Sequence, residues 1–166
     1  MNWTRVIRHL CFPQLVLRRR LPRTAMRNIT QAIRDSERRH CGEIRFAVES
    51  SLPLGRLLSG QSARARAIEL FSLLQTWDTE QNNGVLVYLL LADRDIEIVV
   101  DRDIGRRVPV TRWQAICREM EDTLRDGEFE AGCIAGIRAI GAELERQYPG
   151  TDQHGNELPD EPAVID

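Results

Sequence analysis

The sequence predicts an α/β protein: a three-layer αβα sandwich around a small mixed sheet, in the order α-β-α-β-β-α-α. Three observations favour this class. The chain has 166 residues, which suits one domain with a sizeable core. Apolar residues along positions 24–149 recur at helical spacing in some segments and at strand spacing in others. The longest apolar run, Val85–Ala92, suits a strand covered on both faces and is too short to cross a bilayer.

The first half of the domain reads as helix, strand, helix and strand. A helix is expected from about Thr24 to just before Gly42, because its apolar residues recur at helical spacing. The stretch GEIRFAVE then alternates apolar and polar residues, which is typical of a strand. A second helix is expected over residues 61–76, followed by the VLVYLLL strand. Since a helix links these two strands, they should be parallel, with a right-handed crossover.

The second half begins with a hairpin. Asp93 and Arg94 form the expected turn, after which IEIVV returns as an antiparallel strand. Two further helices are expected, one starting at Thr111 and one after Gly127. The fully apolar second strand should therefore lie in the middle of the sheet, with helices on both sides.

Charge divides the chain into three parts. Residues 1–34 contain eight arginines and no acid, so residues 1–23 are interpreted as a basic arm that precedes the domain at 24–149. Residues 150–166 contain five acids and no Arg or Lys. Because this last segment has Gly and Pro without periodicity, we expect an acidic, disordered tail.

The arm combines apolar and basic residues. In WTRVIRHLC the apolar residues recur at helical spacing, and a second basic cluster follows. Such a segment is typical of docking on a membrane surface or on a protein partner, although it could instead pack on its own domain with its arginines outward. Nucleic acid is disfavoured as a partner, because the domain is acidic and has few aromatic residues for stacking. The docking candidates are Trp3, Arg5, Arg8, Arg18, Arg19 and Arg20.

Oxygen-bearing side chains gather at one edge of the predicted sheet. The stretch DTEQNN precedes the second strand and DRD follows the third, and the hairpin brings both segments to the same side. Carboxylate and amide oxygens suit Ca²⁺ or Mg²⁺. The alternatives are turn chemistry at Asn83-Gly84 and internal pairing with Arg102, Arg106 and Arg107. The candidate ligands are Asp78, Glu80, Asn82, Asn83, Asp101 and Asp103.

The stretches GEIRFAVE and NNGVLVYLLLADRDIEIVVDRDI, with paired helices downstream, resemble the TPM domain. The resemblance covers residues 24–149 and is closest to a short, cytoplasmic bacterial branch of that family. It implies an αβα sandwich. It also implies divalent-metal binding, weak acid phosphatase activity in some members and accessory roles for membrane complexes in others. The family's acidic and Asn/Asp-Gly positions fall on Asp78, Asn82, Asn83, Gly84 and Asp101, whereas Gln81 replaces a residue that is often basic or Ser.

Two functions are therefore expected. The first is a metal-binding interaction or accessory module for a membrane-associated complex. The second is a metal-dependent phosphatase-like hydrolase, in which Asp78 and Asp101 would hold the metal. No general base with a partner stands out, because His9 and His154 fall outside the expected domain and His40 falls at a helix end. The cysteines form no C-x-x-C pair and no membrane span is visible, so we expect a cytoplasmic protein, peripheral at the inner membrane face.

Overall fold

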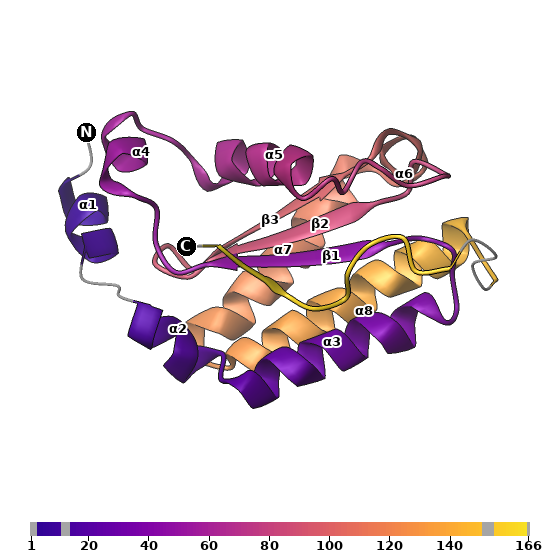
Figure 1. Cartoon of the computed structure of the whole chain (residues 1–166), viewed down its shortest axis with the longest axis horizontal. Coiled ribbons are helices and arrows are strands. Elements are labelled where there is room, and N and C mark those ends of the chain that lie inside the picture. The colour runs from indigo at the N-terminus through magenta and orange to yellow at the C-terminus, as the bar shows by residue number, and fades with distance from the viewer. Residues whose placement is uncertain (1–2, 11–13, 151–154, 166) are drawn as a thin grey trace.

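The computed structural model describes residues 3–10, 14–150 and 155–165, and it confirms the α/β class (Figure 1). The helices are α1 (Trp3–Leu10), α2 (Gln14–Arg20), α3 (Arg23–Glu37), α4 (Leu54–Leu58), α5 (Ala63–Leu73), α6 (Arg102–Arg107), α7 (Val110–Arg125) and α8 (Phe129–Gln147). The strands are β1 (Ile44–Glu49), β2 (Val85–Leu90), β3 (Asp95–Val100) and β4 (Ala163–Ile165). The predicted order corresponds to α3-β1-α5-β2-β3-α7-α8.

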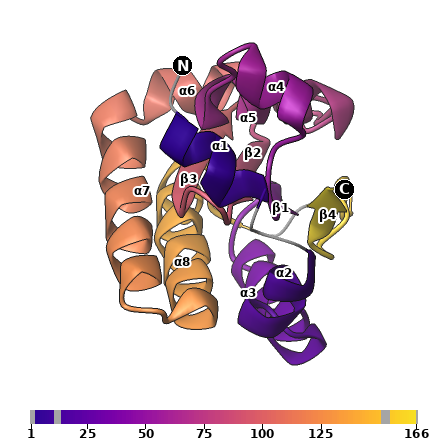
Figure 2. The same ribbon diagram turned by 90° about the vertical axis from the view of Figure 1, so that its left-hand side faces the viewer.

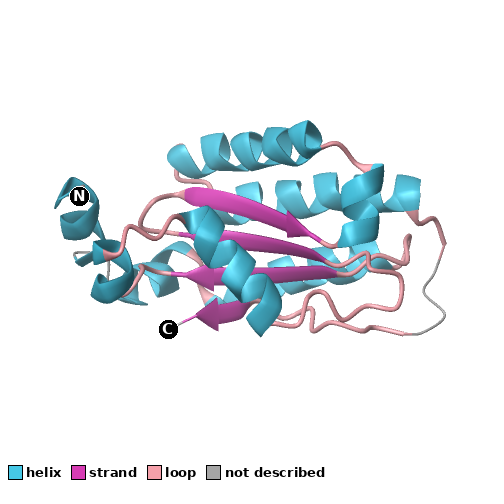
Figure 3. Ribbon diagram, turned by 90° about the horizontal axis from the view of Figure 1, so that it is seen from above, coloured by secondary structure: helices cyan, strands magenta, loops and turns pink. Residues whose placement is uncertain are grey.

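The strands form one four-stranded mixed sheet in the order β3-β2-β1-β4 (Figure 3). β1 and β2 are parallel, with Ile44 opposite Val85. β2 and β3 form the predicted antiparallel hairpin, with Leu90 opposite Asp95. β2 therefore has a neighbour on each side, as its continuous apolar sequence requires.

Helices cover both faces of this sheet (Figure 1). On one face α3, α7 and α8 enclose the larger part of the core, with Phe46 and Val87 among its fully buried side chains. On the other face α5 encloses a smaller cluster that includes Leu86 and Leu90. Every residue of β2 is buried, which confirms the three-layer sandwich.

One polar cluster lies inside the smaller layer. The Tyr88 hydroxyl on β2 donates to Glu49 Oε2 at 2.7 Å, and Arg66 Nε on α5 donates to the same oxygen at 2.9 Å. A buried carboxylate is costly unless it is paired and hydrogen-bonded, and Glu49 has both kinds of partner. The cluster links β1, β2 and α5 at the carboxyl end of the parallel strands.

The predicted disorder of residues 150–166 is wrong for the part that the structure describes, residues 155–165. Residues 163–165 pair with β1 as a parallel strand, with Ala163 opposite Ala47. Arg45 Nη1 donates to the carbonyls of Pro159 and Glu161, both at 2.6 Å. Composition gave no sign of this pairing, because a three-residue strand is too short to show a pattern and its partners lie far away in the chain.

Carboxyl groups gather where the tail meets α3. Arg34 Nε donates to Asp160 Oδ2 at 2.7 Å, and the Ile44 amide donates to Glu37 Oε1 at 2.9 Å. Burial raises the pKa of Glu37 to about 9; the Ile44 amide acts to lower it, and the Glu43 and Asp160 carboxylates raise it further. Glu37 is therefore protonated in the folded protein at neutral pH.

We expect Glu37→Gln to stabilise the protein at alkaline pH. The folded-state pKa of Glu37 lies above its unfolded value of 4.5, so its stabilising contribution is complete below pH 4.5 and is lost as the pH rises toward about 9. Glutamine stays neutral throughout and keeps an acceptor for the Ile44 amide. The free energy of unfolding, measured in urea, should favour the variant by about 2 kcal/mol at the alkaline end and by little at the acid end. Exposed Glu145→Gln serves as the control, and an advantage of Glu37→Gln that does not grow with pH would contradict the assignment.

Candidate functional site

The two predicted oxygen-rich loops meet at one end of the sheet. The Asp101 amide donates to the Gly84 carbonyl at 2.9 Å, and the Asp103 amide donates to the Asn82 carbonyl at 3.1 Å. These bonds place the segment before β2 beside the start of α6, which follows β3 directly. Two of the six candidate ligands, Asn83 and Asp101, are buried at this junction.

Both buried residues have one oxygen without a hydrogen-bond partner in the described part of the chain. Asp101 is the N-cap of α6, and its Oδ1 accepts from the Arg102 amide at 2.6 Å, while its Oδ2 is buried and unpartnered. Asn83 donates through Nδ2 to the Cys41 carbonyl at 2.7 Å, while its Oδ1 is buried and unpartnered. Buried oxygens without partners are rare, and a cation is one explanation for them. The donor chemistry of Asp101 and Asn83 therefore fits a hard divalent cation.

Close packing at Gly84 shapes the segment before β2. A Cβ atom at position 84 would overlap the backbone carbonyl oxygen of Thr76, so the chain can approach itself here only with glycine. Asn82 adopts a φ of 52°, in the left-handed region that Asn tolerates well. The Asn-Gly pair thus does more than turn the chain, because it permits the close contact between the segment before β2 and the Thr76 backbone.

The other four candidates have different surroundings. Asp78, Glu80 and Asn82 are exposed. Asp103 Oδ2 accepts from the Tyr148 hydroxyl at 2.7 Å and from Arg107 Nε at 2.8 Å, and these two bonds, Tyr148 first, lower the pKa of Asp103. Internal pairing with Arg107, one of the predicted alternatives, thus applies to Asp103.

A complete metal centre is not formed by acidic, His and Cys side chains in the described residues. Nowhere in them do three such side chains lie together in a way that could hold an ion. Any cation at Asp101 and Asn83 would need further ligands from amide or carbonyl oxygens or from solvent.

An exposed catalytic base is also missing among the histidines that the structure describes. His40 is 1 % exposed, and its Nε2 lies 2.9 Å from Ser36 Oγ. Burial lowers the pKa of His40 to about 4, so the ring is neutral in the folded protein at neutral pH. These properties suit a structural residue in the core.

At the opposite end of β2, the basic arm packs on its own domain. Arg5 Nε donates to Asp93 Oδ2 at 2.8 Å, and Arg8 also pairs with Asp93. His9 Nδ1 accepts from the Leu52 amide at 2.9 Å, and its Nε2 lies 3.1 Å from Asp93 Oδ1. Burial acts to raise the pKa of Asp93, but His9 and Arg5 outweigh it and lower that pKa to about 2. The expectation that His9 lies outside the folded domain is therefore wrong.

α1, α2 and α4 lie at one end of the molecule (Figure 2), and their exposed apolar side chains form a surface here called the docking end. Its six apolar side chains, between 46 and 74 % exposed, are Trp3, Ile7 and Leu10 on α1, Leu15 on α2, and Leu54 and Leu58 on α4. Arg18 and Arg19 of α2 are exposed as well, whereas Arg20 lies over the Phe129 ring at 5.0 Å. The sequence did not predict α4, because five residues are too few to show a helical pattern. It also did not predict the pairing of Asp93 with the arm, because Asp93 lies far from the arm in the chain.

The αβα fold and the Asn-Gly loop before β2 agree with a comparison of the whole sequence to known families. The TPM domain family matches residues 19–143, and the chain therefore belongs to this family. Among solved structures, the NMR structure of the BA42 protein from the psychrophilic bacterium Bizionia argentinensis is similar. The two chains are 27 % identical with a TM-score of 0.74, over 86 % of this chain and 93 % of that one. A search of curated proteins found no match. No helix in the described residues is long and apolar enough to cross a membrane.

Replacement of Gly84 by alanine should destabilise the loop junction. The added methyl group would overlap the Thr76 backbone, which cannot move aside as a flexible side chain would, so we expect a loss of about 2–4 kcal/mol in the free energy of unfolding. Gly105→Ala is the matched control. Gly105 lies within α6, and a Cβ there would be at an ordinary contact distance of 3.4 Å from Val100 Cγ2 on β3. This substitution should therefore be neutral or stabilising by up to about 1 kcal/mol. Equal effects of the two substitutions in urea unfolding would show that Gly84 is not the constraint described.

Proposed function

We propose that this TPM domain protein is an interaction module that docks on an anionic membrane surface through the docking end, as an accessory factor for a membrane-associated complex. The observation that carries the proposal is the group of exposed apolar side chains on α1, α2 and α4 beside exposed arginines. Exposed apolar side chains gathered on one end of a molecule are typical of protein or membrane interaction sites.

Charge favours a membrane among those partners. Residues 1–34 contain no acid, and the carboxylate of Asp93 beneath α1 is already paired with Arg5 and Arg8. Arg18 and Arg19 are left to attract anionic lipid headgroups, such as those of the cytoplasmic leaflet. Trp3 suits the boundary between headgroups and acyl chains, where amphipathic rings gather. Helices that lie in a membrane interface combine these features.

Sedimentation with vesicles tests the docking proposal. We expect binding to phosphatidylcholine vesicles that contain about one-third phosphatidylglycerol, and weak binding to phosphatidylcholine alone. The double substitution Trp3→Ala and Ile7→Ala should weaken binding by about tenfold, because both side chains lose burial in the interface. The pair Arg18→Glu and Arg19→Glu should also weaken it by about tenfold or more.

Two control variants make this experiment specific. Leu73→Ala removes an apolar side chain about as exposed as Trp3, at the C-terminal end of α5 and outside the docking end. Arg106→Glu reverses a charge on α6, also outside the docking end. Both should bind vesicles like the unchanged protein. If anionic vesicles do not bind the protein, or if the controls lose as much as the docking variants, the membrane proposal fails and a protein partner takes its place.

A divalent-cation site at Asp101 and Asn83 is the second function that we propose. Its support is the pair of buried oxygens, Asp101 Oδ2 and Asn83 Oδ1, that lack partners in the described residues. Asp101 would supply charge and Asn83 a neutral carbonyl, with Asp78, Glu80 and Asn82 as further oxygen donors from the exposed loop. A cation bound there would hold the loop before β2 against α6.

Titration with Ca²⁺ and Mg²⁺, followed by amide NMR shifts, tests this site. We expect saturable shifts in residues 76–84 and 101–105 with a dissociation constant of about 1 mM or below. Asp101→Asn should abolish them, because it removes the charge while the amide oxygen can still cap α6. The exposed Asp122→Asn is the control.

The same protein preparations distinguish the hydrolase alternative. Metal-dependent turnover of p-nitrophenyl phosphate that disappears in Asp101→Asn would establish a phosphatase-like enzyme. Saturable binding without turnover would leave the cation with a structural role. Absence of saturable shifts at millimolar metal would refute the cation site.

A further inference from the structure

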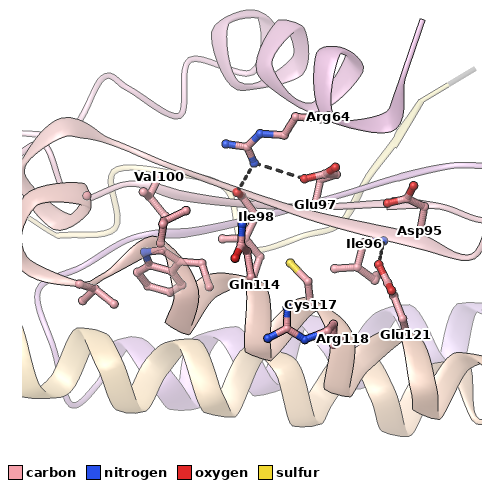
Figure 4. Close-up of a pocket in the computed structure, with 14 residues that line it drawn as sticks. Arg64, Asp95, Ile96, Glu97, Ile98, Val100, Gln114, Cys117, Arg118 and Glu121 are labelled. Atoms are coloured by element: carbon pink, nitrogen blue, oxygen red, sulfur yellow. Dashed lines mark hydrogen bonds and ion pairs between the residues drawn. The ribbon is translucent and has the colours of Figure 1, made fainter. Parts of the chain in front are cut away.

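β3 is an open edge of the sheet, and side chains occupy the positions where a neighbouring strand would bond. The Ile96 amide donates to Glu121 Oε1 at 3.3 Å, and the Ile98 carbonyl accepts from Arg64 Nη1 at 2.6 Å (Figure 4). The amide and carbonyl of one strand residue point to the same side, so Ile96, Ile98 and Val100 present their backbone groups away from β2. Among the described residues, no strand pairs with this side of β3.

A groove of about 730 Å³ runs along this edge. α5 contributes Arg64 on one side of it, and α7 contributes Cys117 and Glu121 on the other (Figure 4). Its volume falls within the range of clefts that bind ligands. Arg64 and Glu121 are side chains with exposed parts, at 49 % and 21 %, so each can turn aside when a competing backbone group arrives.

The two ends of the groove differ in chemistry. Asp95, Glu97 and Glu121 gather at the start of β3, where burial and the other two carboxylates raise the pKa of Asp95 to about 6. A cationic side chain beside these groups would relieve both effects. The far end is apolar and is lined by Val100, Val108, Val110 and Trp113.

The opposite edge of the same sheet already carries an added strand. β4, three residues long, pairs with β1, while Arg34 bonds to Asp160 and Glu161 just before it. Main-chain pairing, charged anchors and the buried side chain of Leu158 together hold this short extended segment on the sheet. β3 offers a longer edge of six residues.

From this combination we propose that β3 binds an extended segment of a partner protein as an added antiparallel strand. The segment carries apolar side chains toward its N-terminal end, beside Trp113, and a basic side chain toward its C-terminal end, beside Asp95. Backbone hydrogen bonds give such a complex its affinity, and the side-chain pockets give it specificity. The site extends the proposed interaction role, but it uses other residues than the docking end, so failure of vesicle binding does not bear on it.

A designed peptide tests the proposal. A fluorescent peptide of sequence Phe-Thr-Val-Thr-Val-Arg should bind the full chain saturably, with a dissociation constant below about 100 μM by anisotropy. Replacing its Arg by Glu should weaken binding by about tenfold or more. Hydrogen exchange at the amides of Ile96 and Ile98 should slow when the peptide is bound. No saturable binding at up to about 1 mM would overturn the proposal.

Matched protein variants separate the groove from general effects. Val110 is 64 % exposed in the first turn of α7, where an acidic residue is compatible with the helix dipole. Val110→Glu should therefore leave the fold intact and weaken peptide binding by about tenfold. Thr111→Glu, next to it but outside the groove, should bind as the unchanged protein does, and equal losses in both variants would overturn the proposed position.

Backbone methylation distinguishes strand pairing from other peptide contacts. In an added strand only alternate peptide amides face β3, so methylating one alternate set should abolish binding while methylating the other set should not. Equal effects of the two patterns would overturn the proposal. Sedimentation of the protein alone provides the last check, because a dimer that Val110→Glu dissociates would assign this edge to a second copy of the chain instead.

Discussion

The burial of β2 on both faces is the constraint on which the rest of the structure depends. All six of its residues are inaccessible, so helices must cover each side and a strand must pair with each edge. Tyr88 is the one β2 side chain with a polar group, and it needs an acceptor inside the protein. Glu49 on β1 supplies that acceptor and in turn needs Arg66, which fixes α5 over the sheet. One apolar strand with a single hydroxyl thus sets the positions of two neighbouring elements.

Most of the central fold could be predicted because it follows from local periodicity. The order α3-β1-α5-β2-β3-α7-α8, the parallel crossover and the hairpin all follow from spacing and from one turn. The elements that were missed are short or are stabilised by distant partners. β4 has three residues and depends on Arg34 and Arg45, which lie over a hundred positions away along the chain. No window of local sequence contains that information.

The candidate site could be predicted only in outline. The sequence brings the two oxygen-rich loops together, because a hairpin returns the chain to the end at which β2 begins. It cannot tell which oxygens remain unpartnered. Asp103 and Asp101 look alike in the sequence, yet Tyr148 and Arg107 bond to the first, whereas one oxygen of the second is buried alone. Likewise Gly84 reads as a turn residue, and only the structure reveals the Thr76 carbonyl packed against it.

The strand β4 also places the C-terminal part of the described chain beside its N-terminal helices. Val164 lines a cavity together with Leu17 and Met26, so the C-terminal strand and the N-terminal helices meet at the same pole of the molecule (Figure 1). A fluorescent label or affinity tag at either terminus would stand beside the docking end and could interfere with it. The loop between α7 and α8, around Gly127, lies at this pole too, because Arg20 of α2 lies over the ring of Phe129 just after that loop.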